Sequence, residues 1–223
     1  YAAAVWLNAP WAYNKAERAG TELAFTELVA DTWSQEKPKL PAPHQVGAEI
    51  WNTTGAMVAS GRGFSKRSLI FHSWVTFSAT ALGFLLGTGL GIALAIGIVY
   101  NRTMDMSVMP WVIASQTIPI LAIAPMIIVV LNAVGISGLL PKAMISMYLS
   151  FFPKLRLPSS MPYLFTSLKI GMAASLVGAI VGELPTGAVA GLGARLLAGS
   201  YYGQTVQIWS ALIMAATLAA VLV

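Results

Sequence analysis

The side chains that could perform chemistry are few, and they do not form a catalytic set. The chain has no cysteine, which excludes disulfides, thiolate catalysis and cysteine metal sites. It has no Gly-x-x-x-x-Gly-Lys-Ser/Thr loop that could hold nucleotide phosphates. His44 and His72 lie far in the sequence from any acidic cluster, so we expect structural or interfacial roles for them. The sequence therefore predicts no catalytic residue and no metal ligand.

Glu183 is the ionisable side chain most suggestive of a function. It lies near the end of an apolar tract, residues 163–184. A carboxylate inside a membrane segment is a candidate functional group. The alternative is a solvated carboxylate at the outer membrane surface, or one that caps the loop beginning at Pro185. The sequence does not choose between these interpretations.

A second group of polar side chains surrounds the prolines of the tract 108–134. Proline in a membrane helix frees backbone carbonyls, which must find partners within the protein or in a water-lined cavity. Many transporters build their pathway from such broken helices. We therefore expect a substrate pathway here, the alternative being a kinked helix that is only structural. The candidate pathway residues are Ser115, Gln116, Thr117, Pro119, Asn132, Tyr148, Ser150 and Glu183.

The composition places these residues in a membrane protein. Apolar residues make up 57% of the chain and charged residues 9%, whereas soluble domains carry roughly 25% charged residues. The mean hydropathy is +0.73. The net charge of +5 is spread over expected helix ends and forms no basic patch, so no nucleic-acid partner is indicated.

The apolar tracts predict an all-α, polytopic membrane helix bundle with about six transmembrane helices and both ends cytoplasmic. We interpret residues 1–13 as the end of a first transmembrane helix, 14–70 as an extracytoplasmic loop and 71–223 as the transmembrane core. Residues 139–153 would reach only about 22 Å as a helix, which is too short to cross a bilayer. The expected full-length spans are residues 74–100, 108–134, 163–184 and 203–223.

The shorter connections are predicted from their polar, glycine and proline residues. Residues 46–60 fit an interfacial amphipathic helix, and the prolines in 37–43 should break any helix before it. Residues 101–107 and 135–138 should be turns, and 185–202 a loop or a re-entrant piece on the outer side. The same topology places Lys142, Arg195 and the Glu183 end of the span 163–184 on the outer side of the membrane.

One stripe of glycines is expected to pack helices together. Gly83, Gly87 and Gly91 recur every fourth residue and so share one face of the span 74–100. The alternative is that glycine is simply common in membrane helices.

A basic, proline-containing stretch at residues 154–162 should lie on the cytoplasmic side of the membrane. Leu155-Arg156-Leu157-Pro158 is similar to the end of the cytoplasmic Glu-Ala-Ala loop in permease subunits of ABC importers. The further pieces that carry the resemblance, in order, are Leu40-Pro41-Ala42-Pro43, Leu82 to Gly87 with Gly91, Ile118-Pro119, Ala124-Pro125, Leu155 to Pro162, Gly178 to Glu183 and Gly191-Leu192-Gly193. Together they resemble the nitrate, sulfonate and taurine class.

The resemblance implies a type I importer permease that works by alternating access in a bacterial inner membrane. Its implied partners are a second permease chain, two ATPase subunits, an extracytoplasmic substrate-binding protein and membrane lipid. ATP and Mg²⁺ would be bound by the ATPase, with no cofactor in this chain. The implied substrate is an anion such as nitrate, a sulfonate or taurine, or a vitamin or pyrimidine precursor. The implied ATPase-coupling residues are Lys154, Leu155, Arg156, Leu157, Pro158 and Ser159.

Two departures from the family pattern bear on this interpretation. The Glu-Ala-Ala portion of the coupling loop is absent although its Leu-Pro end is present, so we expect residues to be missing between Pro153 and Lys154. The polar stretch 14–39 is also longer than the family leads us to expect. An ion-coupled secondary transporter remains the alternative function, and a membrane scaffold without transport activity is a third.

Overall fold

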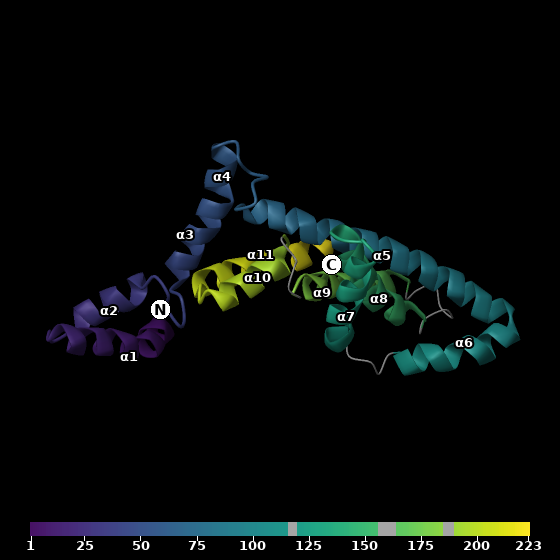
Figure 1. The fold of residues 1–223 in the computed structure, drawn as a ribbon, viewed down its shortest axis with the longest axis horizontal. Coiled ribbons are helices and arrows are strands. Elements are labelled where there is room, and N and C mark those ends of the chain that lie inside the picture. Colours follow the sequence, from purple (N-terminus) through teal and green to yellow (C-terminus); the bar gives the residue numbers. More distant parts are fainter. Residues whose placement is uncertain (116–119, 156–163, 185–189) are drawn as a thin grey trace. The chain divides into compact units, whose positions relative to one another are not determined.

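The computed structural model describes residues 1–115, 120–155, 164–184 and 190–223 (Figure 1). Throughout these ranges the regular structure is helical, without a β-strand, which confirms the all-α class. The helices are α1 Ala2–Ala19, α2 Phe25–Ser34, α3 Pro43–Thr53, α4 Gly55–Ala59, α5 Leu69–Tyr100, α6 Arg102–Ser115, α7 Ile120–Ala133, α8 Leu139–Leu155, α9 Leu164–Glu183, α10 Leu192–Tyr201 and α11 Thr205–Leu222.

The chain divides into two compact units. Unit 1 comprises Tyr1–Phe71 and Arg195–Met214, and unit 2 comprises His72–Ala194 and Ala215–Val223. Each unit is described by itself.

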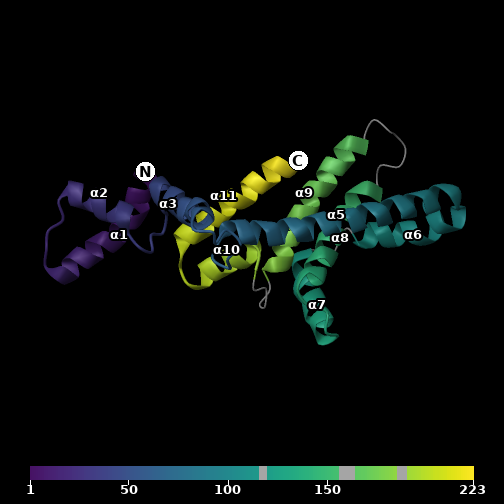
Figure 2. The ribbon, with the colours of Figure 1, turned by 90° about the horizontal axis from the view of Figure 1, so that it is seen from above.

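In unit 1, α1 and α2 pack side by side as a hairpin (Figures 1 and 2). α1 ends at Gly20, whose φ of 66° is left-handed and whose N–H bonds back to the last turn of the helix. The exposed side chains of Lys15 and Arg18 lie within this helix. The helix thus continues six residues beyond the boundary expected at residue 13, because nothing in 14–19 breaks it and Gly20 does.

Asn8 fastens this hairpin to the segment that follows it. Its side chain is buried and donates to the carbonyls of Thr32, at 3.3 Å, and Leu40, at 2.9 Å. Its Oδ1 accepts from the N–H groups of Lys39, at 2.8 Å, and Leu40, at 3.2 Å. One amide therefore satisfies three backbone groups in a proline-containing stretch that has no helix of its own, and ties them to a carbonyl of α2.

The expected interfacial helix at residues 46–60 is instead two helices, α3 and α4. α3 begins earlier, at Pro43, since proline suits a first helical position and the Gln45 side chain accepts from the Ala42 N–H at 2.9 Å. The interruption falls at Thr54.

Three helices of the described ranges are long and apolar enough to cross a membrane: Leu69–Tyr100, Phe165–Glu183 and Thr205–Leu222. These three helices correspond to three of the expected spans. The described ranges therefore contain fewer membrane-spanning helices than the six or so that were expected. The tract 108–134 is divided between α6 and α7. α6 begins at Arg102 where a turn was expected, because the Asn101 side chain accepts from the Thr103 N–H at 2.9 Å and so caps the helix.

Two more connections differ from expectation. α10 is a helix of 10 residues within the stretch 185–202, for which a loop or a re-entrant piece was predicted. α8 runs through Pro153 and Lys154 to Leu155, so the structure shows no break at that point.

Unit 2 contains close packing of α5, α8 and α9. α8 and α9 lie against each other in both views (Figures 1 and 2). On α5, Gly83, Gly87 and Gly91 are all buried. A Cβ atom added to Gly83 would lie 2.4 Å from the Ser146 Oγ and 2.7 Å from the Ala143 carbonyl oxygen, both on α8. The missing side chain at Gly83 is therefore what allows α5 to touch α8.

Candidate functional site

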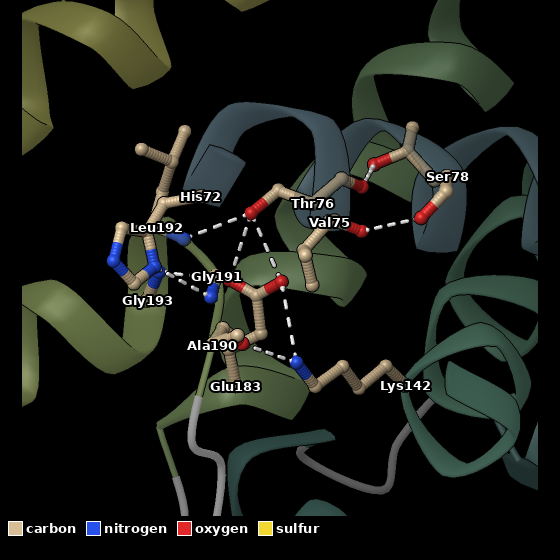
Figure 3. Close-up of polar contacts among 11 residues, drawn as sticks. His72, Val75, Thr76, Ser78, Lys142, Glu183, Ala190, Gly191, Leu192 and Gly193 are labelled. Atoms are coloured by element: carbon tan, nitrogen blue, oxygen red, sulfur yellow. Dashed lines mark hydrogen bonds and ion pairs between the residues drawn. The ribbon is translucent and has the colours of Figure 1, made fainter. Parts of the chain in front are cut away.

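The candidate site is centred on the carboxylate of Glu183, at the last residue of α9 (Figure 3). Its exposed fraction is 0%, so the interpretation as a solvated surface carboxylate is wrong. The Thr76 hydroxyl, from α5, lies 2.9 Å from each carboxylate oxygen, and the Gly193 N–H donates to Oε2 at 2.8 Å. The buried charge is thus held by donors from two other parts of unit 2.

Lys142 supplies the opposite charge. It comes from the first turn of α8, is 7% exposed, and places its Nζ 3.8 Å from the Glu183 Oε1. The ammonium group also donates a hydrogen bond to the Ala190 carbonyl. Figure 3 shows the lysine approaching the carboxylate from the side opposite α5. A buried carboxylate and a buried ammonium group so placed compensate each other, whereas either one alone would be costly.

The segment 190–193 closes the cluster around its backbone. The Gly191 N–H donates to Nδ1 of His72 at 3.0 Å, and the Leu192 N–H donates to Oγ1 of Thr76 at 2.9 Å. Since α10 begins at Leu192, these N–H groups and that of Gly193 belong to its unpaired first turn. Side chains of α5 and α9 therefore cap α10, and the suggestion that Glu183 caps the loop after it is close to what the structure shows.

The glycines at 191 and 193 let the carboxylate come this close. Gly191 has a φ of 126°, and a Cβ there would lie 2.1 Å from Cδ of Glu183. At Gly193 a Cβ would lie 2.3 Å from the carbonyl oxygen of Ile180. No other residue type fits either position without displacing α9.

A second set of buried hydroxyls lies next to this cluster. The Ser175 hydroxyl, on α9, donates to the Thr80 carbonyl of α5 at 2.8 Å, and the Ser146 hydroxyl, on α8, donates to the Ser175 carbonyl at 2.8 Å. The Thr80 hydroxyl donates to the Thr76 carbonyl at 2.8 Å, which joins the two sets. Hydrogen bonds therefore link all three helices in their shared apolar interior.

The described structure tests few of the other predicted pathway residues. Asn132 is exposed near the end of α7. Ser115, Tyr148 and Ser150 lie in helices α6 and α8, but their side chains are outside the description. Gln116, Thr117 and Pro119 fall outside the described residues altogether.

The same limit applies to the coupling residues. Lys154 and Leu155 form the end of α8. Arg156, Leu157, Pro158 and Ser159 lie outside the described ranges. Their proposed contact with an ATPase stays a prediction.

Sequence reasoning found Glu183 but missed its partners Lys142 and Thr76, and it missed His72, which accepts from the Gly191 N–H beside them. A signal for Lys142 was available, because the predicted topology placed Lys142 and Glu183 on the same outer side of the membrane. His72 was given a structural or interfacial role because it lies far in the sequence from acidic residues. In the fold it binds the N–H of Gly191, which lies against Glu183. In the residues that the structure describes, no group of three or more His, Cys, Asp or Glu side chains could hold a metal ion.

No family model matches the sequence. Over 87% of its length the chain is 25% identical to a probable ABC transporter permease protein of Haemophilus influenzae, of which the match covers 86%. It is 30% identical to the formylaminopyrimidine transport permease protein ThiX of Halalkalibacterium halodurans, over 57% of this chain and 62% of the relative. It is 29% identical to the riboflavin transport system permease protein RibX of Chloroflexus aurantiacus, over 70% of this chain and 65% of the relative.

These alignments also contain residues that this chain lacks. The first has 228 positions but takes in 87% of the 223 residues here, about 194, so about 34 positions of the relative have no counterpart. The second alignment has 161 positions and the third has 189. By the same calculation, about 34 positions of the second relative and about 33 of the third have no counterpart in this chain. The resemblance to ABC transporter permeases is confirmed by these relatives, and the chain is a homologue of that family of membrane transport proteins.

Proposed function

We propose that the chain is the transmembrane subunit of an ATP-driven importer that moves a small solute inward by alternating access. The observation that carries this proposal is the similarity to three permeases over 57% to 87% of the chain. The three helices long and apolar enough to cross a membrane support it. Because the chain has no phosphate-binding loop, ATP and Mg²⁺ would be bound by a separate ATPase subunit.

The substrate we propose is a small organic solute, a vitamin or pyrimidine precursor, or an organic anion such as a sulfonate. Two relatives are named for formylaminopyrimidine and riboflavin transport. The predicted pathway residues Gln116, Thr117 and Tyr148 are neutral hydrogen-bonding groups. Such groups suit a polar heterocycle better than a small inorganic anion, which would need fixed positive charge.

The assembly we propose contains two permease chains, two ATPase subunits and an extracytoplasmic substrate-binding protein, in a bacterial inner membrane. Within unit 1, Arg195 donates to Oε1 of Glu49 at 3.3 Å and to the Arg67 carbonyl at 3.0 Å. These contacts join residues that the predicted topology assigns to the same, extracytoplasmic side. They agree with a topology that places residues 49, 67 and 195 on one side of the membrane.

We place the coupling contact with the ATPase in the connection between α8 and α9. Only residues 156–163 join these helices, and the Leu-Pro end of the family's loop lies there. We infer that the relatives' additional positions, about 34, also belong to this connection. The natural protein is then expected to carry them.

Peptide mapping of the protein isolated from its native membrane tests this placement. A lysine-specific protease cleaves after Lys154 and Lys169, so a continuous chain yields a peptide of residues 155–169, which contains the whole connection. We expect this peptide to be replaced by others that contain the additional residues. Recovery of the 155–169 peptide would show that the short connection is the natural one.

Uptake into proteoliposomes tests the function. The permease reconstituted with its ATPase and binding protein should accumulate substrate only when ATP is supplied. Replacing Gln116 by Leu should impair uptake without preventing assembly, and reversing the charge of Arg156 should uncouple ATP hydrolysis from uptake. Uptake driven by an ion gradient in the absence of the ATPase would favour the secondary transporter instead.

A further inference from the structure

The first turn of α10 is capped by side chains that are distant in the sequence. The N–H groups of Gly191 and Leu192 are bound by His72 and Thr76, which lie 119 and 116 residues earlier. Helix caps usually come from the residue immediately before the helix. Here the cap is a tertiary contact, so the start of α10 is ordered only while α5 and α9 hold it.

Glu183 makes the charged contact in this cap. A negative charge is favourable beside the N-terminal N–H groups of a helix. The Gly193 N–H donates to its Oε2 at 2.8 Å, and the Lys142 Nζ lies 3.8 Å from its Oε1. Lys142 also binds the Ala190 carbonyl, so both members of the ion pair hold the same four-residue segment. Removing either member leaves the other buried without its counter-charge.

The backbone around the carboxylate leaves no room for a different arrangement. A Cβ at Gly191 would overlap Glu183, and a Cβ at Gly193 would lie 2.8 Å from the Glu183 Cβ. The segment is therefore fitted to this side chain in its present position. A change at residue 183 must be transmitted to residues 190–193.

We propose that Glu183 is a positioning residue for transport. Its carboxylate, balanced by Lys142, holds residues 190–193 in place, and this placement of the start of α10 is required for substrate transfer. The inference rests on the proposed function, because transfer is measured as ATP-driven uptake. Glu183 acts here through the α10 backbone and needs no contact with substrate.

The absence of cysteine gives a direct way to test the contact. An Ala190→Cys protein carries one thiol in the segment, and its rate of reaction with a maleimide reports how often the segment is released. Glu183→Gln keeps the size of the side chain but removes its charge. Lys142→Met removes the opposite charge, the two together remove the pair, and Glu17→Gln, at an exposed position on α1, is the matched control.

We expect Glu183→Gln to accelerate labelling of the thiol about tenfold or more, the effect of losing one hydrogen bond to a charged group. The maximal uptake rate should fall in parallel, with little change in the substrate concentration for half-maximal uptake. Lys142→Met should act in the same direction. The double variant should lie closer to the parent than either single variant, and Glu17→Gln should match the parent in both measurements.

Two results would overturn the inference. Equal labelling rates for the Glu183→Gln and parent proteins would show that the carboxylate does not hold the segment. Faster labelling with undiminished uptake would show that the placement of α10 is not needed for transport. If the unsubstituted protein shows no ATP-driven uptake, the proposed function fails, and labelling of the Ala190→Cys protein still decides whether Glu183 holds the segment.

Discussion

Replacing Gly83 by Ala should separate a packing glycine from an ordinary one. Gly83 and Gly89 lie on the same helix, α5, but a Cβ at Gly83 would lie 2.4 Å from the Ser146 Oγ, whereas a Cβ at Gly89 would have no neighbour within 4 Å. Alanine raises helix propensity by about 1 kcal/mol at either site. Only at Gly83 does the new methyl group overlap α8, which typically costs about 1–3 kcal/mol.

The difference in stability between the two variants measures the cost of the overlap with α8, since the gain in helix propensity is the same in both and cancels. Gly89→Ala should be as stable as the parent or slightly more stable, and Gly83→Ala should be less stable than Gly89→Ala by about 1–3 kcal/mol. For a chain of this length that corresponds to a thermal midpoint lower by roughly 2 to 12 °C in detergent. Adding Ser146→Gly, which removes two of the three nearest atoms, should recover part of the loss. Equal midpoints for Gly83→Ala and Gly89→Ala would refute the reasoning.

Three more predictions follow from other contacts. Asn8→Ala should lower the free energy of unfolding of unit 1 by about 1–3 kcal/mol for each buried backbone group left unpaired, and an unchanged denaturant midpoint would contradict the role of Asn8. The hydrogen bond from Lys15 lowers the pKa of Asp31, so its contribution, about 0.2–1 kcal/mol for an exposed pair, is complete above the unfolded-state pKa and is lost as the pH falls through the lowered value. This loss, followed by thermal unfolding between pH 7 and pH 3, should disappear in Asp31→Asn. Gly191→Ala should destabilise the protein more than Gly138→Ala in the same melting assay, because both have positive φ but only Gly191 has a neighbour within 4 Å.

The part of the fold that the sequence predicts well depends on length and apolarity alone. The tracts 74–100, 163–184 and 203–223 correspond to α5, α9 and α11, since an uninterrupted apolar run of this length is hard to place anywhere but in a membrane. The turn at 135–138 also agrees, because Gly135 and Gly138 have positive φ. These features are local, so one stretch of sequence contains the whole signal.

The boundaries set by single side chains were harder to predict. Asn101 was interpreted as part of a polar turn, but as a cap it starts α6 one residue later. Gly20, seven residues beyond the expected end of the first helix, stops α1 through its left-handed conformation. In both places a run of polar or charged residues is helical although no helix was predicted there, because polarity predicts exposure and says little about backbone conformation.

The candidate site could be predicted only in part. Glu183 was found because a lone carboxylate in an apolar tract is visible in the sequence. Its partners Thr76 and Lys142 come from two other helices, and no periodic pattern relates them to it. The cap on α10 is a tertiary contact, so it becomes visible only when the three helices are placed together.

The contacts of α5 repeat at intervals of four residues, and this bears on how the helix could slide along its own axis. If α5 slid by four residues toward its N-terminus, about 6 Å, Thr80 would occupy the place of Thr76 and Gly87 that of Gly83. A hydroxyl would replace a hydroxyl, and a glycine a glycine. After such a slide the carboxylate of Glu183 would again face a hydroxyl donor.

The opposite slide meets an obstacle. It would carry Ala79 into the place of Gly83, and the alanine methyl group would then overlap Ser146 as any Cβ does there. It would also present His72, instead of a hydroxyl, to the Glu183 carboxylate. Displacement of α5 toward its C-terminus is therefore opposed at Thr76 and Gly83, whereas displacement toward its N-terminus is opposed at Thr80, whose fully buried place Phe84 would take. Different residues thus fix the position of the helix along its axis in the two directions.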